Sequence, residues 1–158
     1  MLFFYGRKKN NDGFTLVEVL IVLAIFSSLT FLSAPIYFNF SKNTYFSNDL
    51  LKIENLIKRT RQKSFSSLNN SSFGFFLDRD VQQFIFYEGN SFIERSQNSD
   101  IIFDYKDSLK LIAPLENIDI NFFRGSGRPD NEILFLFETG EEKNKSISIN
   151  KYGAIILE

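Results

Sequence analysis

Histidine and cysteine are both absent from this sequence. Their absence excludes zinc sites built from Cys and His, Ser-His-Asp triads, thiol nucleophiles and disulfides. Catalysis would have to depend on carboxylates alone, so the composition disfavours an enzyme, and no residue pattern indicates a cofactor. The formal net charge is −1, which gives the whole chain no electrostatic attraction to nucleic acid.

Apolar residues are abundant, by contrast. They make up 44% of the 158 residues, and 20 of them are phenylalanine. A chain of this length and composition can build one domain with a real core, together with a membrane element.

The longest uncharged run extends from Val19 to Ser41. Its length is sufficient for a transmembrane helix, which needs about 20 predominantly apolar residues. The basic residues at positions 7–9 lie upstream, so the positive-inside rule predicts a cytoplasmic N-terminus and an extracytoplasmic remainder. A cleaved secretory signal is one alternative, but Leu32-Ser33-Ala34 is a poor cleavage site because a small residue is required where Leu32 stands.

A single carboxylate, Glu18, stands at the start of this apolar run. A carboxylate within a membrane segment costs about 2.5–3.5 kcal/mol and less near the interface, so by default it indicates a function and a partner. A plain membrane anchor fits the length of the run but leaves Glu18 unexplained.

A short basic leader is followed by the sequence Gly13-Phe14-Thr15-Leu16-Val17-Glu18 and then by an apolar helix. This pattern resembles the class III signal of type IV pilins and type II secretion pseudopilins. It implies that a membrane prepilin peptidase cuts between Gly13 and Phe14 and methylates the new amine of Phe14. It also implies a structural subunit stored as a single-pass protein of the cytoplasmic membrane, whose partners are other pilin or pseudopilin subunits and an assembly platform in that membrane.

Within this resemblance, Glu18 is an assembly residue and not a catalytic one. Cleavage creates a positive amine at Phe14, four residues away from Glu18, and a charge in a low-dielectric environment needs an opposite charge. In the filaments of the family, the carboxylate pairs with the amine of a neighbouring subunit. Pro35 stands where family members commonly bend the helix, so we expect a kink near Pro35 and a loosened segment through Asn43.

A second, amphipathic helix is predicted beyond this point, with Ser47-Asn48-Asp49 as its start and Leu68 near its end. Its apolar positions follow helical spacing and predict packing against a downstream sheet. The basic run at positions 58–63 is interpreted as a solvated helix face in preference to a nucleic-acid contact, because no aromatic residues are interleaved with it.

The C-terminal half alternates β-rich runs with turn signals. The predicted strands are residues 73–77, 83–87, 91–94, 101–103, 109–112, 118–122, 133–137, 146–149 and 154–157. No βαβ repeat is present, so we expect an α+β fold in which a long N-terminal helix packs on an antiparallel sheet or sandwich. We therefore divide the chain into a leader (1–13), a transmembrane and assembly helix (14–38), an amphipathic helix (39–70) and a β-rich domain (71–158).

The order of these elements, and the final strand after Tyr152-Gly153, are similar to the pseudopilin H branch of minor pilins. The resemblance implies a minor subunit of a type II secretion pseudopilus or type IV pilus. An alternative is a minor pilin that binds DNA or a surface. The basic C-terminal tail typical of DNA-binding members is missing, because acidic and basic residues balance in residues 141–158.

Two loops contain residues that suggest binding chemistry. Arg124-Gly125-Ser126-Gly127 lacks the third glycine and the following helix of a nucleotide-binding motif, so we interpret it as a hairpin connection. Asp78 and Asp80 supply too few oxygens for calcium and are interpreted as turn residues.

Overall fold

A computed structural model describes the backbone of residues 14–106, 109–138 and 144–158, and the side chains of these residues outside 32–43. The chain divides into two compact units, the first ending at Ser41 and the second comprising Lys42–Glu158. The helix α1 (Leu16–Phe65) contributes to both units, and the strands belong to the second.

Helix α1 is a single α-helix of 50 residues. The predicted loosened segment after Pro35 and the predicted second start at Ser47-Asn48-Asp49 are therefore wrong. Proline lacks the backbone N–H, so one helical hydrogen bond is missing, but the helix continues past this position. Asp49 lies within the helix and forms a 2.8 Å ion pair with Lys52, so it supports the middle of the helix and not its start. The kink at Pro35 stays a prediction.

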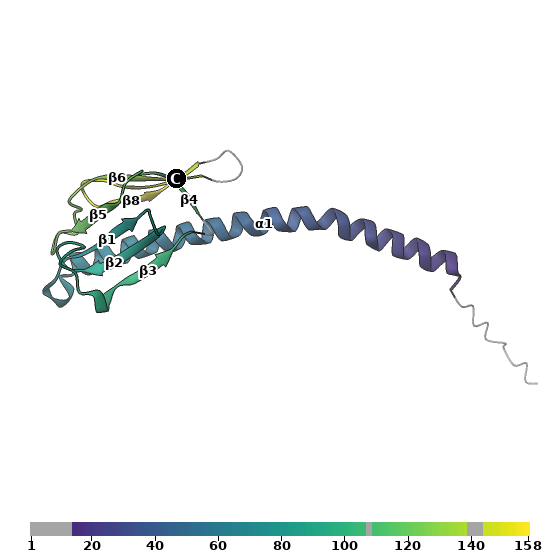
Figure 1. Ribbon diagram of the computed structural model, residues 1–158, viewed down its shortest axis with the longest axis horizontal. Helices are drawn as coiled ribbons and strands as arrows, with labels where there is room; N and C mark the ends of the chain where they lie inside the picture. Colours follow the sequence, from purple (N-terminus) through teal and green to yellow (C-terminus); the bar gives the residue numbers. More distant parts are fainter. Residues whose placement is uncertain (1–13, 107–108, 139–143) are drawn as a thin grey trace, which may run out of the picture. The chain divides into compact units, whose positions relative to one another are not determined.

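The described strands form two antiparallel sheets of four strands each, which face each other as a sandwich (Figure 1). Sheet A has the order β3-β2-β1-β5 and sheet B the order β4-β6-β7-β8. The strands are β1 (Phe73–Asp78), β2 (Gln83–Glu88), β3 (Ile101–Asp104), β4 (Lys110–Ala113), β5 (Ile118–Phe122), β6 (Ile133–Glu138), β7 (Asn144–Ile149) and β8 (Ile155–Leu157). The prediction of an α+β fold with antiparallel sheets is confirmed.

Alternation along the strands separates a core face from an outer face in each sheet. In sheet A, alternate residues of β1, β2 and β5 point into the core, and in sheet B the same holds for β6 and β7. The fully buried side chains at these positions include Phe75, Leu77, Phe84, Ile120, Phe122, Phe135, Phe137, Ile147 and Ile149. The high phenylalanine content of the sequence is thus used mainly to fill the space between the two sheets.

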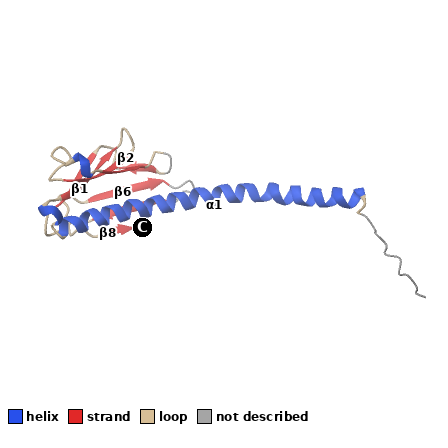
Figure 2. Ribbon diagram, turned by 90° about the horizontal axis from the view of Figure 1, so that it is seen from below, coloured by secondary structure: helices blue, strands red, loops and turns tan. Residues whose placement is uncertain are grey.

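The second half of α1 packs on this core, and Figure 2 shows the helix passing along the domain. Leu50, Ile53 and Ile57 are at most 2% exposed and belong to the same apolar cluster as the strand residues. Their spacing is that of one helical face, as predicted. Near the end of the helix, the hydroxyl of Ser64 donates to the carbonyl of Phe122 and accepts from the N–H of Phe73 at 3.1 Å, which joins α1 to β5 and β1.

Residues 91–94 are not a strand, contrary to the prediction. The ring of Phe92 stacks on Phe76 with a centroid distance of 4.0 Å, and the guanidinium of Arg95 lies 3.7 Å from the centroid of Phe92. The N–H of Phe92 donates to Asp119 at 2.9 Å. Because these side-chain contacts hold the segment in place, it covers the outer face of sheet A as a loop and does not add a strand.

A cluster of polar side chains, Tyr87, Asp119 and Asn121, lies beside the loop of residues 91–94. The hydroxyl of Tyr87 donates to Asp119, and the side-chain amide of Asn121 donates to the carbonyl of Gly89 at 2.8 Å. Burial, followed by the hydrogen bond to Asp119, raises the pKa of the Tyr87 phenol. Gly74 lies directly opposite, and a Cβ there would come within 2.4 Å of the Tyr87 oxygen. The close approach of strand and tyrosine therefore requires glycine at position 74.

Candidate assembly segment

The start of α1 is fixed by a reciprocal hydrogen-bonding arrangement between Thr15 and Glu18. Oε2 of Glu18 accepts from the backbone N–H of Thr15 at 2.8 Å and from its hydroxyl at 2.9 Å, and the N–H of Glu18 donates to the Thr15 hydroxyl at 3.3 Å. The carbonyl of Thr15 accepts the first helical bond, from Val19. This is a capping box, with Thr15 as the N-cap and Glu18 three positions into the helix.

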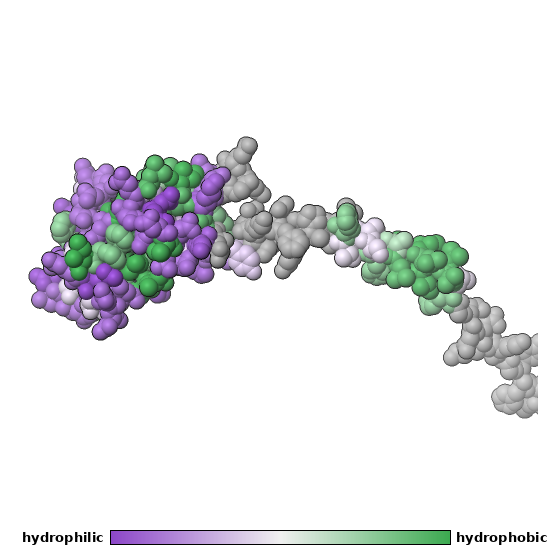
Figure 3. All heavy atoms as spheres, viewed as in Figure 1, coloured by the Kyte–Doolittle hydropathy of each residue, from purple (hydrophilic) through white to green (hydrophobic). Residues whose placement is uncertain are grey.

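The helix that follows the cap is apolar on all sides. From Phe14 to Phe31 its large hydrophobic side chains are between 45% and 89% exposed, and Figure 3 shows this part of the chain as a green surface. The members are Phe14, Leu16, Val17, Val19, Leu20, Ile21, Val22, Leu23, Ile25, Phe26, Leu29 and Phe31. An apolar surface of this extent marks a segment that is covered by lipid or by other protein.

Polar side chains in this segment are satisfied within the helix. The hydroxyl of Ser27 donates to the carbonyl of Leu23 at 2.7 Å, and that of Thr30 donates to the carbonyl of Phe26 at 2.8 Å. Such bonds to preceding carbonyls supply a partner for the hydroxyl inside the helix. The segment therefore does not need water around its hydroxyl groups.

Within the part of the chain that the structure describes, no helix is sufficiently long and apolar to cross a membrane. The predicted transmembrane helix is therefore not confirmed.

The structure describes some of the predicted site residues and not others. Gly13 lies outside the described residues, and Phe14 is 89% exposed directly before the capping box. Glu18 is on the first turn of α1, and Pro35 is in the helix at a position whose side chain is not described. Thr15 was not predicted to have a role, although its spacing from Glu18, Thr-x-x-Glu before an apolar run, is the sequence signal of a capping box.

Replacing Thr15 by valine is expected to loosen the first turn of α1, because it removes the hydroxyl that accepts the N–H of Glu18. An N-cap is typically worth about 1 kcal/mol, so the amide of Glu18 should exchange with solvent several times faster in the full-length chain in detergent micelles. Thr15→Ser keeps the hydroxyl and is the control. Equal exchange rates in the two variants would contradict the capping role.

Most basic side chains of the run at positions 58–63 contact other residues of the same domain. Lys58 forms a 2.6 Å ion pair with Glu54, and Nε of Arg61 donates to the carbonyl of Gly127 at 3.0 Å. The ammonium of Lys63 lies 5.5 Å from the centroid of the Phe73 ring. These contacts support the interpretation of the run as part of the domain's own surface.

The two loops with suggestive sequences have structural roles. Oδ1 of Asp78 accepts from the N–H groups of Asp80 and Val81, which closes the turn between β1 and β2. The loop that contains Gly127 connects β5 to β6, which belong to different sheets, so the predicted hairpin connection is wrong. Gly127 has a φ of 60°, and a Cβ there would lie 3.1 Å from Phe65. Among the described residues, no group of His, Cys, Asp or Glu could hold a metal ion.

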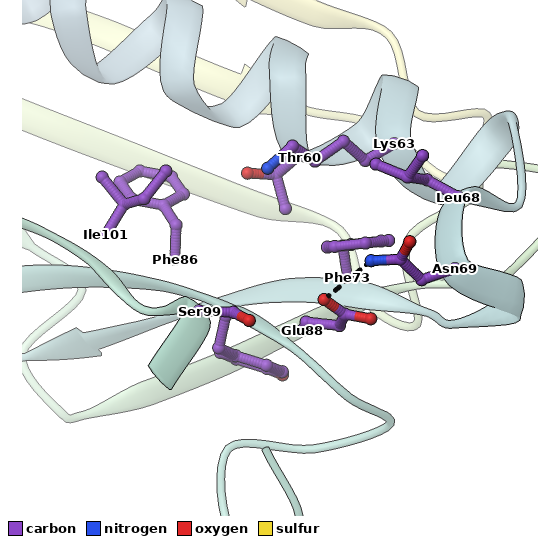
Figure 4. A pocket seen from close by; sticks show the side chains of 10 residues that line it. Thr60, Lys63, Leu68, Asn69, Phe73, Phe86, Glu88, Ser99 and Ile101 are labelled. Atoms are coloured by element: carbon purple, nitrogen blue, oxygen red, sulfur yellow. Dashed lines mark hydrogen bonds between the residues drawn. The ribbon is translucent and has the colours of Figure 1, made fainter. Parts of the chain in front are cut away.

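A pocket of about 240 Å³ lies between the last turns of α1 and strands β2 and β3 (Figure 4). Its lining is mixed, and Phe73, Phe86 and Ile101 contribute the apolar part. Lys63 comes from the helix side, and Asn69 and Glu88 are joined by a 3.3 Å hydrogen bond at one end. A lining of mixed apolar and polar side chains suits a side chain better than a free ion.

Residues 8–34 match the family model of the prokaryotic N-terminal methylation motif. This match includes Gly13, Phe14 and Glu18 and supports a type IV pilin-like or pseudopilin subunit of the kind that prepilin peptidase processes. Pilin-like proteins with this motif are structural subunits and not enzymes. Neither a curated protein nor a solved structure matches the chain.

Proposed function

We propose that this chain is a minor pilin-like or pseudopilin subunit, which prepilin peptidase cleaves between Gly13 and Phe14 and methylates on Phe14. The observation that carries the proposal is the position of the methylation motif. The motif spans the end of the basic leader and the first part of a capped helix that is apolar on every side. Gly13 suits a cleavage site because an extended, unhindered peptide is needed there and glycine has no Cβ.

The apolar part of α1 then serves two functions in turn. Residues 14–38 hold the subunit in the cytoplasmic membrane, with the leader inside and the domain of residues 71–158 outside. Satisfied hydroxyls such as those of Ser27 and Thr30 are what a helix in lipid requires. An assembly platform in the membrane transfers the subunit into a filament, where the same surface packs against the helices of other subunits and Pro35 bends the helix.

Glu18 gives the filament its register. In the structure only Oε2 of Glu18 accepts hydrogen bonds from described residues, and both come from Thr15. A carboxylate has about four acceptor positions on two oxygens, so Oε1 can accept the methylated amine of a neighbouring Phe14 while the cap is kept. The capping box thus holds the carboxylate in place before its partner arrives, and losing one partner of a buried ion pair costs about 3–5 kcal/mol.

The contacts of the basic run do not favour the alternative of a DNA-binding minor pilin, because Lys58 and Arg61 are already engaged within the domain. The pseudopilin H branch remains our preferred assignment, because the order of helix and sandwich is similar to that branch, and it fits a minor subunit of a type II secretion pseudopilus. The same arrangement of elements fits a minor subunit of a type IV pilus.

Cleavage is tested by replacing Gly13 with tryptophan. In cells with an active prepilin peptidase, mass spectrometry of the purified wild-type chain should show an N-terminus at methylated Phe14. The Gly13→Trp chain should keep its leader, with a fall in processing of at least about tenfold, because a bulky side chain blocks the extended backbone at the cut. Gly6→Trp makes the same change within the leader and should leave processing normal. A wild-type chain that begins at Met1 would overturn the proposed function.

A further inference from the structure

Strand β3 is the outer strand of sheet A and has an unused hydrogen-bonding edge. It pairs only with β2, in the register Phe84↔Phe103 and Ile85↔Ile102. The N–H of Tyr105 donates to the carbonyl of Gln82, so the residues of odd number in this segment bond inward. The N–H and C=O groups of Ile102 and Asp104 therefore point away from β2, and no described residue outside the sheet bonds to them.

The other sheet edges are protected. β5 is covered by its own chain, since Phe122 bridges to Pro129 and the N–H of Asp130 donates to the carbonyl of Asn121. On β4, the carbonyl of Leu111 accepts from Arg79 at 2.8 Å. β8 is only three residues long. Natural proteins protect edges by cover and by shortness. β3 has four residues, one more than β8, and no described residue covers its edge, so this edge is available to another strand.

Apolar surface accompanies the open edge. Ile101 is 43% exposed and Ile102 is 59% exposed, on opposite faces of β3. In Figure 3, green surface lies on the front of the domain, where Figure 1 places β3. Two exposed isoleucines on an unprotected edge would promote aggregation unless a partner covers them.

The pocket shown in Figure 4 lies at the end of the same row of side chains. The register places Phe75, Phe86 and Ile101 side by side on the core face of sheet A, and Phe86 and Ile101 both line the pocket. A strand added beyond β3 would place its next core-face side chain beside Ile101. That position leads toward the pocket, to which Phe86 and Ile101 contribute apolar surface.

The outer face of the edge has a different chemistry. Asp104 is exposed there, and its Oδ1 accepts the N–H of Lys106 at 2.9 Å. A strand beside β3 would therefore meet a carboxylate on the outer face and, on the core face, the part of the pocket that Phe86 and Ile101 line. Because side chains alternate between the faces, the best complement is a segment that alternates apolar and basic residues. A second β3 does not fit this pattern, because it would bring another acidic edge.

We propose that β3 is a docking edge for an extended segment of a partner polypeptide with alternating apolar and basic residues. The segment adds a fifth strand to sheet A, bonds the backbones of Ile102 and Asp104, and inserts an apolar side chain beside Ile101 into the pocket. This inference concerns the domain alone and does not depend on cleavage at Gly13 or on assembly through α1.

The first experiment measures amide exchange in the full-length chain in detergent micelles. The probe is a short acetylated and amidated peptide of alternating valine and lysine. We expect the amides of Ile102 and Asp104 to exchange about tenfold more slowly with the peptide present, because they become hydrogen-bonded. A peptide of alternating valine and glutamate is the control and should give no protection, because its carboxylates face Asp104.

The second experiment changes the edge itself. Ile102→Pro removes one outward N–H without removing a bond to β2, and should weaken binding of the lysine peptide at least about tenfold. Ile102→Thr keeps the backbone donor and should stay within about threefold of the wild type. Slow exchange of the Tyr105 amide in each variant shows that β3 still pairs with β2.

The pocket is tested separately from the edge. Ser99 is exposed at the pocket rim, so Ser99→Trp fills the pocket from outside and should also weaken the lysine peptide about tenfold. Asn98→Trp adds the same ring one residue away from the rim and should bind as the wild type does. Unchanged exchange at Ile102, equal binding of the two peptides, or full binding by Ile102→Pro would each overturn the proposal.

Discussion

A chain in which Glu18 is replaced by alanine is expected to be processed normally but to be nearly absent from filaments. Removing the carboxylate leaves the amine of a neighbouring Phe14 without its counter-charge in an apolar environment, at a cost of about 3–5 kcal/mol. Incorporation should fall by at least about a hundredfold, because each 1.4 kcal/mol is a factor of ten. The measurement is the ratio of the variant to the wild type in sheared filaments, against their ratio in membranes.

Two further variants separate charge from capping. Glu18→Gln keeps an oxygen for the Thr15 donors but has no charge, so it should fail as Glu18→Ala does. Asp49→Ala removes another acidic residue of α1, one that pairs with Lys52 in the second unit, and should assemble normally. Normal incorporation of Glu18→Gln would show that the carboxylate acts only as a cap.

The largest effect on stability is expected for Phe75→Ala. Phe75 is fully buried, and four other rings surround it, those of Phe84, Phe86, Phe122 and Phe135, at centroid distances between 5.8 and 6.3 Å. Removing the ring leaves a cavity between the sheets, so the free energy of unfolding should fall by about 3–5 kcal/mol. Urea unfolding of the full-length chain in detergent, followed by near-ultraviolet circular dichroism, measures this change.

Phe123→Ala is the matched control for this prediction. Phe123 is 55% exposed on the loop after β5, so truncation of its ring should change stability by no more than about 0.5 kcal/mol. If Phe75→Ala were as mild as Phe123→Ala, the packing of the two sheets around this ring would be wrong.

The strands were predictable because alternating runs and turn residues mark them clearly, and eight of the nine predicted segments are strands. The failure at residues 91–94 has a physical cause. Phe92 and Ile93 resemble a strand in composition, but a stacked ring, an arginine and a distant carboxylate stabilise a loop there. The contacts of Phe92 with Phe76 and Asp119 join residues far apart in the sequence and leave no periodic signal.

The division of strands between two sheets was not predictable for the same reason. Consecutive strands β5 and β6 lie in different sheets, whereas β1 pairs with the distant β5. Turn chemistry between neighbours could not reveal this pairing. Helix α1 was predicted to break because local signals, a proline and then Ser-Asn-Asp, outweighed the continuity of the apolar face.

For the assembly segment, the sequence supplied the motif but not the hydrogen bonds. The Thr-x-x-Glu spacing is the signal of a capping box, but charge pairing alone accounts for Glu18, so the motif does not by itself reveal the bonds to Thr15. The pocket and the open edge of β3 depend on register and exposure, which are properties of the folded chain alone. Neither the basic run nor the glycine loop pointed to them.

The hydroxyl of Ser64, which bonds to both Phe122 and Phe73, has a mechanical consequence. In the proposed filament, a subunit experiences load through its helix. A pull on α1 within the second unit would act on these two hydrogen bonds and on the packing of Leu50, Ile53 and Ile57 together. Because the three apolar side chains belong to one cluster, we expect the attachment to yield as a unit. We therefore expect the sheets to stay attached to α1 up to a threshold force and then to detach in one step, without gradual stretching.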